Sequence, residues 1–125
     1  RSLDANAYFW VLANEIAKTF KSTDEEIYIK MLKLYGAKDY VAALEGAEPI
    51  LRRVYKIVEP LKETMINDKV GLTYRLIRGS STYDTLEMSQ LIEGIVTECK
   101  ELGIQTMTPQ EVRELVEKWG EYVNI

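Results

Sequence analysis

The sequence predicts a single α+β domain over residues 1–125, built from about five helices and a small antiparallel β element. Several segments repeat apolar residues at three- and four-residue steps, which is typical of amphipathic helices. One segment between residues 70 and 78 is instead rich in β-forming residues. The length of 125 residues and the hydrophobic content of 46% suit one globular core.

The first three helices are indicated by apolar repeats and by end signals. The first is expected over about 3–20. The second follows a capping box formed by Thr23 and Glu26 and ends near Gly36. A third helix is expected over 47–59, with Pro60 just beyond its end.

The last two helices carry equally plain signals. The fourth is expected over about 85–102, starts at the Asp84 cap and ends at Gly103. The fifth begins at a second capping box, Thr108 to Glu111, and is expected to stop at Gly120.

The β element is expected around residues 70–78, after a turn at 67–69. Alternation places Leu72, Tyr74, Leu76 and Arg78 on one face of this strand. The mixed pattern favours an edge strand or a β-ribbon. Its partner is either residues 37–45, which fit a strand or a helical turn, or the same strand of a second subunit.

Composition excludes several classes of enzyme. The chain has no histidine and one cysteine, Cys99, which rules out His-based triads and His-bearing zinc sites. There is no P-loop, GxGxxG, nucleophile elbow or CxxC pair. We therefore expect no enzymatic activity, no cofactor and no metal site. Cys99 is expected to be a buried thiol, which fits a reducing, cytoplasmic compartment.

The sequence shows no signal peptide and no apolar run of the roughly 20 residues that a membrane span needs. We therefore expect a soluble protein. Because residue 1 is Arg rather than Met, the native chain is expected to begin upstream.

Charge is unevenly distributed along the chain, whose net charge is −4. Residues 84–125 carry three Lys/Arg against nine Asp/Glu, so a nucleic-acid surface should lie before them. Arg52, Arg53 and Lys56 form the densest basic group. Lys69, Arg75 and Arg78 bracket Tyr74, and a loop with Ser80 and Ser81 follows.

Such a combination suits single-stranded DNA, because cations bind phosphates, rings stack on bases, and free loop amides hold anions. An edge strand that uses charges to resist aggregation explains the same residues equally well.

Two sequence blocks resemble those of small phage proteins similar to the NinB/Orf recombination family. They are Arg1-Ser2-Leu3-x-x-Asn6-Ala7-Tyr8-x-Trp10 and the Gly-Ser-Ser-x-Tyr-Asp-Thr-x-x-Met-Ser-x-Leu-Ile run at 79–92. The resemblance implies a mixed α/β protein, typically dimeric, that binds single-stranded DNA and helps to load a strand-exchange protein. A related group carries an HNH nuclease, whose His and Cys residues this chain lacks.

The sequence thus predicts a non-enzymatic phage recombination accessory protein in the cytoplasm of a bacterial host cell. Its expected partners are single-stranded DNA, a recombinase or single-strand-binding protein, and a second copy of itself. The expected DNA contacts are Arg52, Arg53, Lys56, Lys69, Tyr74, Arg75, Arg78, Ser80 and Ser81. The alternative is a protein–protein adaptor or inhibitor of a host factor that uses the acidic helices of 84–119. A metal-dependent nuclease is a third reading.

Overall fold

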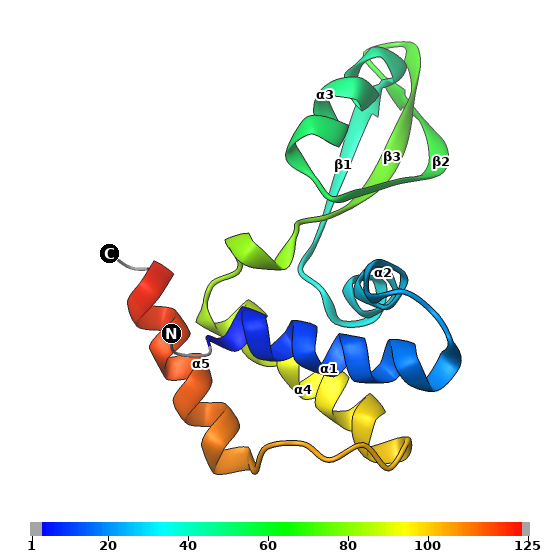
Figure 1. Cartoon of the computed structure of the whole chain (residues 1–125). Helices are drawn as coiled ribbons and strands as arrows, with labels where there is room; N and C mark the ends of the chain where they lie inside the picture. The colour runs from blue at the N-terminus through cyan, green and yellow to red at the C-terminus, as the bar shows by residue number, and fades with distance from the viewer. Residues whose placement is uncertain (1–3, 124–125) are drawn as a thin grey trace. The chain divides into compact units, whose positions relative to one another are not determined.

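The computed structural model describes residues 4–123 and divides into two compact units (Figure 1). The helical unit consists of the chain up to Gly36 and from Ser80 onward, and the sheet unit is Ala37–Gly79. Within the described residues there are five α-helices and a three-stranded antiparallel sheet, which confirms the α+β class. Arg1 and Ser2, the start of the first sequence block, lie outside the described residues.

The helical unit contains α1 (Ala5–Phe20), α2 (Asp24–Tyr35), α4 (Thr85–Glu101) and α5 (Pro109–Val123). A short 3₁₀ helix, Ser80–Thr82, precedes α4. The predicted apolar faces of α1 and α4 form its core, which includes Phe9, Leu12, Leu91, Ile92 and Ile95. Apart from the end of α5, the helices of this unit begin and end close to the residues that their caps predicted, because these signals act locally.

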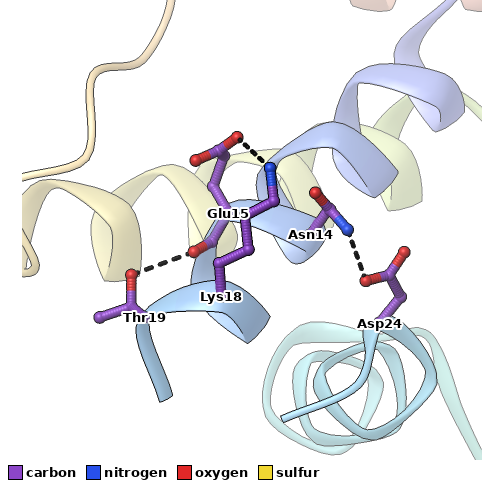
Figure 2. Close-up of polar contacts among 5 residues, drawn as sticks. All are labelled: Asn14, Glu15, Lys18, Thr19 and Asp24. Atoms are coloured by element: carbon purple, nitrogen blue, oxygen red, sulfur yellow. Dashed lines mark hydrogen bonds and ion pairs between the residues drawn. The ribbon is translucent and has the colours of Figure 1, made fainter. Parts of the chain in front are cut away.

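Side-chain caps fix the helix starts. The Asp84 carboxylate accepts from the Glu87 N–H at 2.8 Å, and the Glu87 carboxylate accepts from the Asp84 N–H at 3.0 Å, which completes the capping box of α4. Figure 2 shows the Asn14 amide donating to Asp24 at 2.8 Å, a bond that joins α1 to the first residue of α2.

Gly120 does not end α5, contrary to the sequence prediction. The helix passes through it to Val123, and a Cβ at Gly120 would lie 2.6 Å from the Thr85 hydroxyl. Glycine is therefore present here because two helices of this unit approach closely, rather than as a terminator.

A buried hydrogen-bond network fixes the first residue after the sheet unit. Ser80 is 1% exposed, its N–H donates to the Tyr28 hydroxyl at 2.8 Å, and its hydroxyl donates to Asn6 at 2.6 Å. Asn6 belongs to α1 and Tyr28 to α2, so the network joins three segments of the helical unit.

The sheet unit contains β1 (Lys38–Leu44), α3 (Glu48–Val54), β2 (Ile57–Ile66) and β3 (Lys69–Ile77). The strand order is β1-β3-β2, and both pairs are antiparallel. Asn67 and Asp68 have φ of 49° and 66°, which suits the two-residue turns that join right-twisted strands. The predicted turn at 67–69 is confirmed.

β3 is the central strand, which corrects the prediction of an edge strand. It pairs with β1, which contains residues 38–44 of the segment proposed as its partner, and also with β2. Both of its edges are therefore occupied. The other candidate partner, the same strand of a second subunit, therefore has no free edge of β3 with which to pair.

The expected helix over 47–59 is wrong beyond Val54, because β2 begins at Ile57 and contains Pro60. The register of β2 shifts between Pro60 and Lys62. Proline removes a backbone donor but is tolerated at bulges and on edge strands, and β2 is an edge strand.

α3 covers one face of the sheet. Val58, Tyr74 and Leu76 form a small core, and Leu51 and Tyr55 pack against it from α3 and the residue that follows. The opposite face has no helix of this unit over it, since α3 is the unit's only α-helix.

We expect Tyr28→Phe to lower the free energy of unfolding by about 1–3 kcal/mol, because the buried Ser80 N–H would lose its acceptor. Urea denaturation followed by circular dichroism measures this loss. Tyr35→Phe is the matched control, since its hydroxyl donates to Glu98 at a partly exposed position where water can replace it. An equal loss in the two variants would contradict the role given to the network.

Candidate nucleic-acid interface

The sheet face opposite α3, which we call the open face, carries three successive cross-strand rows. Side chains alternate along a strand, so the neighbours of the buried Tyr74 and Leu76 lie on this face. The rows are Tyr40–Arg75–Glu59, Ala42–Thr73–Lys62 and Leu44–Gly71–Thr64.

Arg75 lies in the middle of the first row, on the central strand. Its Nε donates to Glu59 at 2.9 Å. This bond and, secondly, the Tyr40 hydroxyl raise the pKa of the guanidinium above its ordinary value. A guanidinium has five N–H donors, so these neighbours orient it and still leave donors for a ligand.

Tyr40 is the exposed aromatic residue of this row. Its side chain is 60% exposed. It lies beside Arg75 on the neighbouring strand. A ring next to a guanidinium provides a stacking surface and a hydrogen-bonding group within one row of the sheet.

Positive charge predominates on the open face. The face also includes Lys38 and Lys69, so four cations share it with one strand carboxylate, Glu59. Partial burial lowers the pKa of Lys38, and the positive charge of Arg75 lowers it further. A bound anion would relieve this repulsion between neighbouring cations.

The two units differ in charge. The sheet unit, residues 37–79, has eight Lys/Arg and six Asp/Glu, and the remainder of the chain has eight Lys/Arg and fourteen Asp/Glu. Lys69 and Arg75 are the two predicted contacts that the structure brings onto the open face.

Tyr74 is the main correction to the predicted site. It is 0% exposed and packs in the small core beneath α3, so its ring has no surface on which a base can stack. Burial, followed by the negative charge of Glu48, raises the pKa of its hydroxyl.

Ser80 is the second correction. Its amide donates to Tyr28 in the interior, so it is not available to a phosphate. Ser81 is exposed, but it belongs to the helical unit together with Ser80. Arg78 follows β3 and lies 3.8 Å from the Asp39 carboxylate.

The other predicted basic group lies on the opposite side of the sheet. Arg52 and Arg53 belong to α3, and Lys56 follows it. Arg52 pairs with Glu48 at 3.3 Å. Since α3 covers the face opposite Arg75, the two basic groups of the sheet unit do not form one surface.

Sequence reasoning missed Tyr40 and Lys62. The signal that identifies Lys62 is the turn at 67–69: pairing outward from it in an unbroken register places Lys62 opposite Thr73, before the register shift at Pro60 is reached. Tyr40 could be identified only if residues 37–45 were interpreted as a strand rather than as a helical turn.

The helical unit has a groove of about 490 Å³ between α4 and α5. Val96, Met107, Val112 and Val116 line it, together with charged residues at its rim. Among residues 4–123, no group of three or more His, Cys, Asp or Glu side chains is placed to hold a metal ion. None of the helices in that range is both long enough and apolar enough to cross a membrane.

Comparison of the chain with protein-family models, with curated proteins and with solved structures found no match.

We expect the Cys99 thiol to be unreactive in the folded protein. It is fully buried, and burial, followed by the charges of Glu15 and Glu98, raises its pKa to about 11. At pH 8 a chromogenic disulfide reagent should label it only after denaturation in urea. Rapid stoichiometric labelling of the native protein would contradict this placement.

The same shift predicts a pH dependence of stability. The unfolded thiol ionises near its ordinary pKa of about 9, whereas the folded thiol resists ionisation until about pH 11. The free energy of unfolding should therefore fall as pH rises through this interval. Urea denaturation of Cys99→Ala over the same interval should lack this component.

Proposed function

We propose that this chain binds single-stranded DNA through the open face of the sheet unit. The observation that carries the proposal is the row Tyr40–Arg75–Glu59, in which an exposed ring lies beside an oriented guanidinium. Lys62 and Lys69 add positive charge on the same face. The sheet unit also has more Lys/Arg than Asp/Glu, whereas the rest of the chain is acidic.

The physical basis is a division of roles among these side chains. Cations attract the phosphate backbone, which accounts for most sequence-independent affinity and makes binding sensitive to salt. An exposed ring on a sheet stacks on a base, as is usual in proteins that bind single strands. Stacking requires an unpaired base, which favours a single strand over a duplex.

We further propose that the protein acts without catalysis as an accessory factor in phage recombination, in the cytoplasm of a bacterial host. This part rests on the resemblance of residues 1–10 and 79–92 to phage recombination proteins. A recombinase or a single-strand-binding protein is then the natural protein partner, and the resemblance also favours a homodimer.

A protein–protein adaptor is the second candidate function. The observation that favours it is the acidic helical unit, whose α4–α5 groove has an apolar lining. An adaptor of this kind would bind a host factor without binding DNA. The DNA titration below therefore distinguishes the two functions.

We expect Arg75→Ala to weaken binding of a labelled single-stranded oligonucleotide by about tenfold, since it removes a cation and a hydrogen-bonding group. Lys62→Ala should weaken binding less and reduce the dependence of affinity on salt by about one phosphate contact. Fluorescence anisotropy at several salt concentrations measures both effects.

Lys18→Ala is the matched control, because Lys18 is an exposed cation on α1 of the helical unit. It should leave affinity nearly unchanged. No binding by the unmodified protein even at low salt would reject the proposal in favour of the adaptor. A duplex bound more tightly than the single strand would reject the strand preference.

We expect Tyr40→Ala to cost about 1–3 kcal/mol of DNA-binding free energy, the usual value of one stacked base. Tyr40→Phe keeps the ring and should retain most of the affinity. The same anisotropy titration measures both variants. Equal losses would show that the hydroxyl, which contacts Arg75, matters rather than the stacking surface.

A further inference from the structure

The sheet unit leaves more large apolar side chains exposed than it buries. Its buried ones are Ile57, Val58, Tyr74, Leu76 and Ile77. Its exposed ones are Tyr40, Leu44, Ile50, Val54, Leu61, Met65 and Val70. A contiguous group of exposed apolar side chains marks an interaction surface, whereas single exposed ones are normal, so the position of each in the fold decides.

Two of these residues share one side of α3. Ile50 and Val54 are four residues apart on the helix and are 60% and 67% exposed. Leu51 and Tyr55, also four apart, instead pack on the small core. The helix therefore has an inner apolar stripe that is covered and an outer apolar stripe that is not.

Met65 and Val70 are further exposed apolar side chains, on the side of the sheet that α3 covers. They are directly opposite each other in the β2–β3 register, and Val70 shares the face of Leu72 and Tyr74, which α3 covers. They are 64% and 60% exposed. Ile50, Val54, Met65 and Val70 are therefore not on the open face proposed to bind DNA, whereas Tyr40 and Leu44 of the exposed set are.

One cation, Arg53, lies beside the outer stripe. Arg53 is three residues from Ile50 and adjacent to Val54, so it lies beside the stripe, and it is exposed. Arg52 and Lys56 are on the same short segment. This is the basic group that the open face does not include.

We infer that the outer side of α3, comprising Ile50, Arg53 and Val54, is a docking surface for an acidic protein segment that carries apolar side chains. Charge complementarity selects the acidic segment over a basic one. The apolar stripe selects a protein segment with apolar side chains over a nucleic-acid backbone, which carries a charged phosphate at every nucleotide. This inference does not depend on the proposed binding of DNA.

The probe is a short fluorescein-labelled peptide in which Asp and Glu alternate with Leu and Phe. One control peptide replaces its acidic residues with Lys, and another replaces its apolar residues with Ser. We expect the first peptide to bind and both controls to bind at least about tenfold more weakly, because each lacks one of the two complementary features. Anisotropy at moderate salt measures the three affinities.

Variants of the protein locate the surface. Arg53→Glu and Ile50→Ser should each weaken the probe by about fivefold to tenfold. The matched controls are Lys18→Glu and Val11→Ser on α1, which make the same kind of change at exposed positions of the helical unit and should have little effect. Circular dichroism verifies that each variant is folded.

Several outcomes would overturn the inference. The inference is wrong if the probe peptide fails to bind or if the Ser-containing peptide binds equally well. It is also wrong if the control variants weaken binding as much as Arg53→Glu does. If Arg53→Glu abolishes single-stranded DNA binding without affecting the probe, the basic group belongs to the DNA site instead. If Ile50→Ser converts a dimer to a monomer and leaves the probe unaffected, a second copy is the occupant.

Discussion

The pairing of β3 on both sides is the constraint on which the sheet unit depends. Because β1 and β2 flank it, its alternate side chains are fixed on opposite faces. Tyr74 and Leu76 join α3 in the core, and this obliges Thr73 and Arg75 to face the other way. A slip of one residue would bury Arg75 and expose Tyr74, so the packing of the core and the position of the cation have one cause.

A second constraint acts where the chain leaves the sheet unit. Ser80 is held by Tyr28 of α2 and by Asn6 of α1, and Asn6 is 74 positions away in the sequence. The segments 1–10 and 79–92, far apart in the sequence, therefore meet at one hydrogen bond inside the helical unit. The Ser80 hydroxyl and the Asn6 amide have a structural reason to be there, since a buried hydroxyl requires a hydrogen-bond partner and Asn6 provides its acceptor.

Local signals were sufficient for α4, for the starts of α2 and α5 and for the turn at 67–69, because a cap or turn depends on neighbouring residues. They failed at β2, where Ile57 and Val58 continue the apolar spacing of the preceding helix and Pro60 resembles a terminator. Long-range pairing with β3 decides that segment instead.

The same limit applies to the site. Tyr40 and Tyr74 both lie in strands, and only the face that α3 covers determines which ring is buried.

The small size of the sheet unit links its two proposed surfaces. A unit of this length with five large buried apolar side chains is expected to have modest stability. Any ligand that binds only its folded form stabilises it by mass action. A single strand on the open face and an acidic segment on α3 would thus each favour the same folded sheet. The size of the coupling between the two ligands depends on the fraction of the unit that is unfolded without ligand. A wholly folded unit gives no coupling by this route. In a partly unfolded unit, either ligand raises the apparent affinity for the other.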